Sequence, residues 1–295
     1  MPARRISFLN FKGGVGKTSL SVNVAACLAH NFNQRVLLID CDSQSNASIW
    51  LMGVARWNII NDAPEKSVYG IFEPYAPNIY NSVQRSVLRG DNDQVLIPKL
   101  DLLPATYDLM NLEDEYLDNE TVPFYYRFYD KITPFFDQYD YIIFDCPPNV
   151  FRASKCALFA SREVYVPCNP DVLSYIGLAL LVKKVKKFQH NTVAMRQLIP
   201  GYRPAKLRGI ILNAVDGRAN YSDILNKMRA RIQHLRKSDV VCDDADILAQ
   251  RIRDSVEAGR VVGDNKPAVL ARGIPGLKED YINLCRYIHH TPLED

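Results

Sequence analysis

The strongest constraint on how this chain folds is a glycine-rich stretch close to its N-terminus. The stretch reads NFKGGVGKTS over residues 10–19; an apolar run precedes it, and Leu20, Val24 and Leu28 follow at helical spacing. A strand, a glycine loop and a helix in this order present backbone amides that bind phosphate, because glycine has no Cβ to block the approach. The sequence therefore predicts a phosphate-binding loop at the end of the first strand of an α/β domain.

The loop departs from the usual pattern G-x-x-x-x-G-K-[ST] at one position. Counting back five residues from Gly16 gives Phe11 in place of the first glycine, and a second lysine, Lys12, follows it. In this pattern we expect Lys17 to reach the β- and γ-phosphates, and the Thr18 hydroxyl to bind Mg²⁺. The predicted nucleotide-binding residues of the loop are Gly13, Gly14, Val15, Gly16, Lys17, Thr18 and Ser19.

Six short apolar runs predict the strands of the sheet. They lie at residues 6–11, 36–40, 100–105, 141–145, 163–167 and 209–213, with a weaker candidate at 247–252. Uninterrupted apolar runs are typical of parallel strands that are buried on both faces. Because helical spacings alternate with them, we predict a doubly wound, mostly parallel central sheet with helices on both faces.

Composition and length are compatible with a single domain. The chain has 295 residues, of which 47% are hydrophobic and 23% charged, as in ordinary soluble globular proteins. We expect one domain over residues 1–295, with an elaborated surface connection at 53–98, where prolines and the turn-like RGDNDQ interrupt regular patterns. No window approaches ~18 uninterrupted apolar residues, so no membrane-spanning helix is expected. Seven cysteines without C-x-x-C spacing indicate free thiols in a reducing cytoplasm.

Two of the predicted strands end in an aspartate. Asp40 closes VLLID and Asp145 closes YIIFD, and Asp42 follows in DCDSQSN. The carboxyl ends of the strands of an open α/β sheet face one crevice, so these carboxylates are expected to meet the phosphate loop. Asp145 has the position of the carboxylate that binds Mg²⁺, partly through water, in phosphate-loop NTPases.

The net charge of +3 hides an asymmetry between the two halves of the chain. Residues 1–150 hold 12 Lys and Arg against 18 Asp and Glu, whereas residues 151–295 hold 24 against 15. A basic half of this kind indicates an anionic partner. Solvated helix faces that differ in charge explain the asymmetry equally well.

Five stretches of the chain resemble, in order, the deviant Walker ATPases of the ParA/MinD family, and most of all the short ParA/Soj-type DNA-partition ATPases. They are FKGGVGKTS, VLLIDCDSQSNAS, LDLLPATYDLMNLEDEYL, YDYIIFDCPP and VYVPCNPDVLSYIGLALL. The resemblance runs over residues 1–215 and continues more weakly through IRDSVEAG and DNKPAV. It implies ATP and Mg²⁺ as cofactors and ATP hydrolysis as the reaction.

The resemblance also assigns roles to single residues. Lys12 matches the signature lysine of the family, which reaches across a nucleotide-sandwich dimer to the phosphates of the other subunit. This role agrees with simple electrostatics, since two facing triphosphates repel strongly unless cations lie between them. By the same resemblance, Asp40 positions or polarises the attacking water, and Asp42 supports the switch segment near the γ-phosphate. Asn213 contacts the adenine.

The segment after Asp40 departs from the family pattern. Ser43 stands where the family generally has proline, and Ser45 stands where it generally has glycine. In the loop itself, Ser19 replaces the more usual second threonine. We expect the first two changes to loosen the switch segment. Because no glutamate or histidine stands out as a general base, we also expect slow hydrolysis that a partner accelerates.

The resemblance further predicts the partners. In the family, ATP-bound homodimers bind double-stranded DNA without sequence preference through basic residues of the C-terminal half, and a ParB-like activator protein triggers release. Phosphate contacts of this kind need only clustered Lys and Arg. The expected location is the nucleoid in the cytoplasm of a bacterium or archaeon, where the protein segregates plasmid or chromosome DNA. Candidate DNA contacts are Lys183, Lys184, Lys186, Lys187, Arg218, Arg253 and Arg260.

Three other functions are open on the same fold. A MinD-like membrane-bound positioning ATPase needs a basic amphipathic C-terminal helix. Here Glu279 and Asp280 lie beside the apolar stripe of Leu277, Tyr281 and Leu284, so we expect a packed helix and no membrane contact. An iron–sulfur carrier needs paired cysteines, and the chain has neither C-x-x-C nor C-P-C. A nucleoid-bound ATPase that positions a protein cargo has the same motifs as a DNA-partition ATPase.

Overall fold

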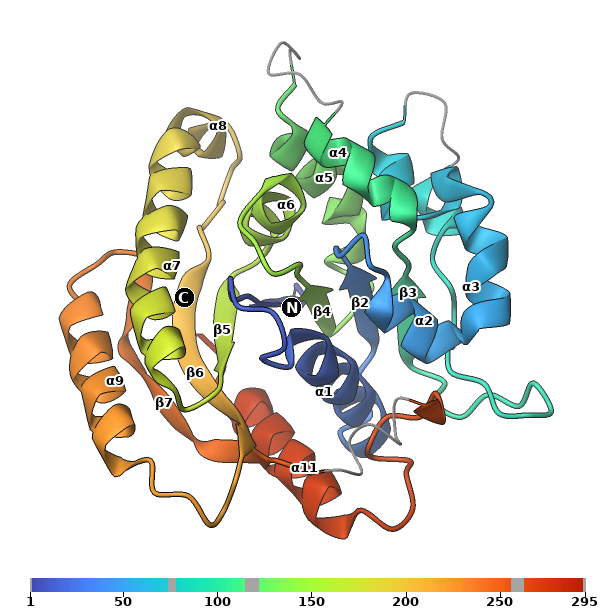
Figure 1. Ribbon diagram of the computed structural model, residues 1–295. Coiled ribbons are helices and arrows are strands. Elements are labelled where there is room, and N and C mark those ends of the chain that lie inside the picture. Colours follow the sequence, from blue (N-terminus) through green and yellow to red (C-terminus); the bar gives the residue numbers. More distant parts are fainter. Residues whose placement is uncertain (1, 74–77, 115–121, 256–262, 294–295) are drawn as a thin grey trace.

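Seven parallel strands form one sheet through the middle of the molecule (Figure 1). The computed structural model describes residues 2–73, 78–114, 122–255 and 263–293. The spatial order of the strands is β3-β2-β4-β1-β5-β6-β7, and every named pair is parallel. Each apolar run of the sequence, including the weaker candidate, overlaps one of these strands, which confirms the predicted sheet; β1 ends at Phe8 and β3 at Leu103, before the ends of the predicted runs. The strands are β1 (Arg4–Phe8), β2 (Val36–Asp40), β3 (Leu100–Leu103), β4 (Tyr141–Asp145), β5 (Glu163–Cys168), β6 (Lys206–Val215) and β7 (Val241–Arg253).

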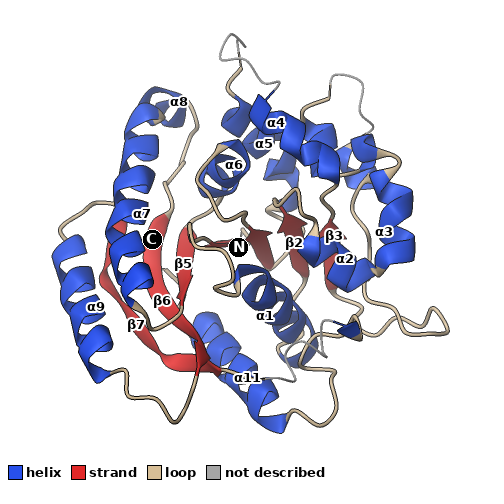
Figure 2. Cartoon of the chain, viewed as in Figure 1, coloured by secondary structure: helices blue, strands red, loops and turns tan. Residues whose placement is uncertain are grey.

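Helices cover both faces of the sheet, and each set closes its own hydrophobic core (Figure 2). One core is covered by α1 (Lys17–Asn31), α2 (Asn46–Met52), α3 (Val54–Asn61) and α11 (Pro275–His290). The other is covered by α4 (Asn111–Asp114), α5 (Phe124–Ile132), α6 (Arg152–Ala160), α7 (Val172–Asn191), α8 (Val193–Gln197) and α9 (Ser222–Leu235). Short 3₁₀ turns lie at Pro64–Lys66, Val68–Ile71, Ile79–Asn81, Tyr107–Met110 and Thr133–Phe135.

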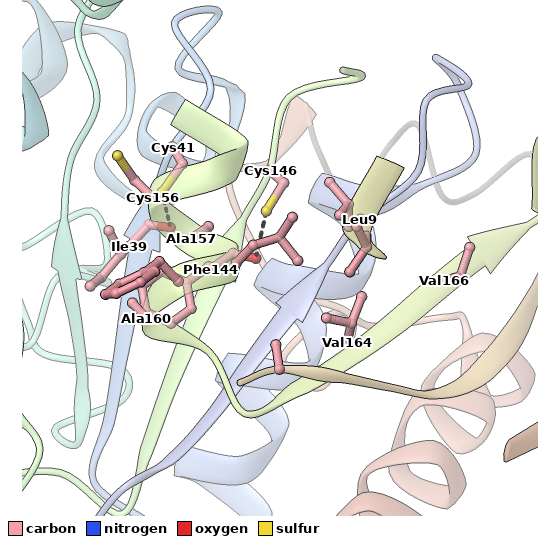
Figure 3. Packing of buried hydrophobic residues seen from close by; sticks show 14 of the residues in the cluster. Leu9, Ile39, Cys41, Phe144, Cys146, Cys156, Ala157, Ala160, Val164 and Val166 are labelled. Carbon is pink, nitrogen blue, oxygen red and sulfur yellow. Dashed lines mark hydrogen bonds between the residues drawn. The ribbon is translucent and has the colours of Figure 1, made fainter. Parts of the chain in front are cut away.

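The strands that carry the predicted site are buried along their whole length. Every residue of β2, β4 and β5 is buried, as uninterrupted apolar runs predict. Figure 3 shows part of the core beneath α6, where Phe144 of β4 lies with Ala157, Ala160 and Cys156. The ends of these strands are therefore held in a close-packed core. All seven cysteines are buried free thiols, as their spacing predicts.

Residues 53–98, expected to form a surface connection, contribute to both cores. Val68 and Ile71 are buried in the core under α5 and α6, and Trp57 and Val87 are buried in the core under α1. The backbone of Gln84 exchanges two hydrogen bonds with Leu102 of β3, at 2.7 and 3.0 Å. The connection thus covers one edge of the sheet.

The C-terminal helix α11 packs on the body of the protein, as expected. Leu277, Tyr281, Leu284 and Ile288 are buried in the same core as α1. Among the helices in the described part of the chain, none has the length and hydropathy needed to cross a membrane.

Candidate nucleotide site

The glycine loop joins β1 to α1 at the carboxyl edge of the sheet. Gly14 and Gly16 have φ angles of 73° and 85°, and Gly16 is the N-cap of α1. Side chains other than glycine are strained in this left-handed region. Since β1 lies between β4 and β5, the loop is flanked by the connections that leave those two strands. Its amides and the N-terminus of α1 form a ready site for an anion.

Lys17 folds back over the loop. Its side chain is buried, and its Nζ donates a hydrogen bond to the backbone oxygen of Lys12 at 3.1 Å. Burial lowers the pKa of Lys17, and the carboxylates of Asp145 and Asp42 oppose that effect. A buried ammonium group with acidic neighbours is thus held within reach of a phosphate bound by the loop.

Asp145 has a free oxygen where a metal ion is expected. Its Oδ1 accepts a hydrogen bond from Ser21 Oγ at 2.9 Å, and the Thr18 hydroxyl lies near enough to lower the pKa of the carboxylate. Its Oδ2 is buried without a hydrogen-bond partner among the described residues. Burial raises the pKa of Asp145, and the bonds from Thr18 and Ser21 oppose the rise. A buried carboxylate oxygen without a donor, beside a hydroxyl group, fits Mg²⁺, which prefers oxygen ligands.

The two aspartates after β2 have different surroundings. Asp40 is fully buried: its Oδ2 accepts hydrogen bonds from the amide and Oγ of Ser48, at 2.9 and 2.7 Å, and its Oδ1 accepts from the amide of Asp42 at 3.1 Å. Burial, followed by the nearby Asp145, raises the pKa of Asp40 well above its ordinary value. Burial also raises the pKa of Asp42, but the Gln44 amide, which donates to its Oδ1 at 3.0 Å, and the nearby Lys17 oppose the rise.

These contacts change the role that we expected for Asp40. We expected this residue to position the attacking water, but both of its oxygens are used inside the protein to hold the start of α2. Among the described contacts, Asp42 has only its Oδ1 bonded, to the amide of Gln44, and it lies near Lys17, so it is the better candidate for a contact with water or γ-phosphate.

The backbone of Ser45 has a left-handed conformation. Ser45 is the N-cap of α2, is fully buried and has φ 56° and ψ 27°, in the left-handed region. This conformation is strained for a residue with a side chain. The glycine that the family generally has at this position would relieve the strain.

Lys12 lies at the rim of the loop and is paired within its own chain. Its Nζ forms an ion pair with Asp171, and its side chain is 32% exposed. Asp171 is also the N-cap of α7, because its Oδ1 accepts a hydrogen bond from the Ser174 amide at 2.8 Å. The ion pair thus connects the phosphate loop to the first turn of α7.

Asn213 of β6 lies against the loop. Its Nδ2 donates to the Val15 backbone oxygen at 3.0 Å. A Cβ added to Gly16 would lie 2.0 Å from the same nitrogen, so the close approach of Asn213 requires glycine there. The structure thus places the residue expected to contact adenine beside the phosphate loop.

The candidate DNA contacts fall into two groups. The four lysines of the 183–187 run are exposed on α7, and Lys186 lies 3.4 Å from Asp239. The arginines are engaged with carboxylates: Arg218 pairs with Asp216 at 3.2 Å, and Arg253 binds both oxygens of Asp280. Arg260 lies outside the described residues. The structure therefore brings the lysines together and gives Arg253 a structural contact.

Several residues of the site were not indicated by the sequence pattern. Ser21, Ser48 and Asp171 hold the side chains of the motifs in place. The N-cap position of Asp171, in NPDVLS, is the one signal that sequence alone offers. On α9, which lies beside α7 in Figure 1, Lys227 and Arg229 are also exposed.

Several known proteins are similar to this chain in amino-acid sequence. A family model described as an AAA domain matches residues 3–198. The sporulation initiation inhibitor protein Soj of Bacillus subtilis (strain 168) is 33% identical over 217 residues, which cover 73% of this chain and 74% of Soj. The chromosome partitioning protein ParA of Myxococcus xanthus (strain DK1622) is 34% identical over 218 residues, covering 74% of this chain and 67% of that protein.

Solved structures share the fold over nearly the whole chain. Apo McdA from Cyanothece superposes with a TM-score of 0.68 at 16% identity and covers 96% of this chain and 99% of its own. A plasmid partition protein from Borrelia burgdorferi B31 bound to AMPPNP has a TM-score of 0.64 at 19% identity, covering 96% of both chains. Cobyrinic acid a,c-diamide synthase from Mycobacterium smegmatis, with an ATP analog and magnesium, has a TM-score of 0.68 at 20% identity, covering 96% of this chain and 93% of that one.

Proposed function

Because this chain belongs to the ParA/Soj family of phosphate-loop ATPases, we propose that it is an ATP-dependent DNA-partition switch built as one domain over residues 1–295. With ATP and Mg²⁺ it forms a homodimer that binds double-stranded DNA without sequence preference. Hydrolysis, slow by itself and accelerated by a ParB-like activator protein, releases the DNA. The protein acts on the nucleoid in the cytoplasm and segregates plasmid or chromosome DNA.

The single observation that carries this proposal is the different placement of two lysines in one loop. Lys17 is buried and folded over the loop, whereas Lys12 stands at its rim, partly exposed. Lys17 therefore serves the nucleotide of its own chain. Lys12 is in a position to serve the phosphates of a facing chain once it leaves Asp171.

The nucleotide and its metal ion are held by side chains that the sheet brings together. The backbone of residues 13–19 and Lys17 bind the phosphates, and Thr18 and the free Oδ2 of Asp145 hold Mg²⁺. When bound, Mg²⁺ neutralises charge on the phosphates. Asn213, bonded to the loop at Val15, is close enough to the site to sense whether a nucleotide is present.

Asp42 and Asp40, at the start of the switch segment, have different roles. Asp42, which lies near Lys17, orients the attacking water. Asp40 fixes α2 through Ser48 so that Asp42 keeps its position. Because no glutamate or histidine stands out in the sequence as a general base, hydrolysis is slow until a partner accelerates it.

DNA binding is assigned to the exposed face of α7 and α9. The lysines of α7 and the basic residues of α9 lie on neighbouring helices of the more basic half of the chain. Clustered Lys and Arg bind the phosphate backbone without reading sequence. In a dimer the two copies of this surface act together, so affinity for DNA rises when ATP is bound.

The dimer is tested by removing the second lysine. We expect Lys12→Ala to bind a non-hydrolysable ATP analogue within roughly threefold of the wild type, since surface ion pairs contribute little. The variant should remain monomeric with the analogue, as measured by light scattering after size-exclusion chromatography. Lys131→Ala, which removes an exposed lysine of α5, is the control and should dimerise normally. A Lys12→Ala variant that dimerises as well as the control contradicts the proposed role of the loop.

A further inference from the structure

Ser21 lies in α1, four residues after Lys17, and its side chain is completely buried. Its Oγ is within hydrogen-bond distance of two acceptors, the backbone oxygen of Lys17 at 3.0 Å and Oδ1 of Asp145 at 2.9 Å. A serine hydroxyl carries one proton, so it donates to only one of these acceptors at a time. The side chain therefore connects the helix that follows the phosphate loop to the carboxylate at the end of β4.

The backbone oxygen of Lys17 is enough to satisfy a buried serine at this position. Serine within a helix often donates to the carbonyl group one turn earlier, without help from another element. Ser154 of α6 is a comparable case, since it is also buried and donates to the backbone oxygen of Asn149 at 2.8 Å. In the described hydrogen bonds of these two serines, only Ser21 has a carboxylate as a second acceptor.

The carboxylate of Asp145 depends more on this contact than Ser21 does. The last torsion of an aspartate side chain is broad and roughly two-fold, so the side chain alone does not fix where each oxygen lies. A hydrogen bond to a charged carboxylate is also stronger than one to a neutral carbonyl group, which favours donation to Asp145. Ser21 thus holds Oδ1, while Oδ2 is buried without a hydrogen-bond partner among the described residues.

We propose that Ser21 is a positioning residue that sets the affinity of the site for Mg²⁺, because it holds Asp145 by one oxygen and leaves the other for the ion. The inference rests on the proposed function, which assigns Mg²⁺ to Thr18 and Asp145. It adds a residue that does not touch the ion and acts through one of its ligands. Removal of a group that orients a metal ligand typically weakens metal binding by about 10–100-fold.

The test measures Mg²⁺ binding separately from nucleotide binding. Protein freed of metal with EDTA is mixed with a fluorescent ADP analogue, and the binding of the analogue is followed as Mg²⁺ is added. Ser21→Ala removes the hydroxyl and should fold, because alanine is the better helix former. Ser21→Thr keeps the hydroxyl and is the rescue variant. Ser154→Ala is the matched control, since it removes a buried helical hydroxyl that is bonded to a backbone oxygen.

We expect Ser21→Ala to melt and to bind the analogue in EDTA like the wild type, while the Mg²⁺ concentration at half-saturation rises about 10-fold. Ser21→Thr and Ser154→Ala should both respond to Mg²⁺ like the wild type. If Ser21→Ala responds like Ser154→Ala, or if a folded Ser21→Thr loses as much affinity as Ser21→Ala, the inference is wrong and the proposed function stands. If Mg²⁺ does not change the binding of the analogue to the wild type, the metal assignment and the inference are both wrong.

Discussion

The ion pair between Lys12 and Asp171 joins the phosphate loop to the first turn of α7. Lys12 pairs with Asp171 in the single chain, and the proposed dimer requires that the lysine leave this partner. The ion pair is partly exposed on both sides, so breaking it costs little. Dimerisation therefore competes with a weak contact, and the balance can be shifted by one substitution.

Replacing Asp171 by asparagine should favour the dimer. Asparagine caps a helix as well as aspartate does, so α7 keeps its N-cap while the ion pair with Lys12 is lost. We expect Asp171→Asn to tighten dimerisation with a non-hydrolysable ATP analogue by about threefold, as measured by sedimentation. Asp239→Asn, which removes the exposed partner of Lys186, is the control. Dimerisation as weak as the wild type, or weaker, speaks against a competing ion pair.

The strained residue of the switch segment offers a second test. Ser45→Gly should raise the free energy of unfolding by about 0.5–1 kcal/mol, because glycine adopts a positive φ without strain. Urea unfolding measures the change. Ser43→Gly, two residues earlier and without a positive φ, should instead lower stability. Equal shifts for the two variants would show that the backbone of Ser45 is not strained.

The residues of a contiguous motif could be predicted from sequence, and those that complete the site through space could not. The placement of Lys17, Thr18 and Asp145 at one edge of the sheet could be predicted, because a loop pattern and strand ends fix their positions. Asp171 and Ser48 were missed because their partners are distant along the chain or depend on the turn between β2 and α2. The internal hydrogen bonds of Asp40 could not be predicted, because burial is not visible in a motif.

Among the helices and strands, the buried ones were predicted well and the edge ones less so. β2, β4 and β5 are uninterrupted apolar runs, whereas β7 extends over Val241–Arg253 and carries charged residues that conceal its pattern. The long connection at 53–98 was expected on the surface, yet its buried side chains lie at irregular spacing and line both cores. Irregular spacing gives no periodic signal to follow.

The contact between Arg253 of β7 and Asp280 of α11 allows a test of whether Arg253 has a structural role or binds DNA. Arg253 binds both oxygens of Asp280, at 2.7 and 2.9 Å, and its amide donates to the same carboxylate. Arg253→Ala and Asp280→Ala should both lower the melting temperature, Asp280→Ala more, because Arg253→Ala leaves the amide bond to Asp280 in place. If Arg253 only anchors α11, both variants should bind DNA alike, as measured by fluorescence anisotropy. If Arg253→Ala lost DNA binding and Asp280→Ala did not, Arg253 would be a DNA contact after all.

At the level of the whole molecule, the fold and the family do not by themselves determine the function. The same architecture occurs in a plasmid partition protein and in cobyrinic acid a,c-diamide synthase, so architecture alone does not select a function. The selection rests on the second lysine of the loop and on the basic half of the chain. Both features support the proposal that bound nucleotide controls the affinity of the protein for DNA.

The most direct test is binding to random-sequence duplex DNA with a non-hydrolysable ATP analogue, with ADP and without nucleotide, across a series of salt concentrations. A switch of the proposed kind binds tightly with the analogue alone, and its affinity falls steeply as salt rises, because bound phosphates release counterions. Equal binding in all three states, or none in any, contradicts control of DNA binding by ATP.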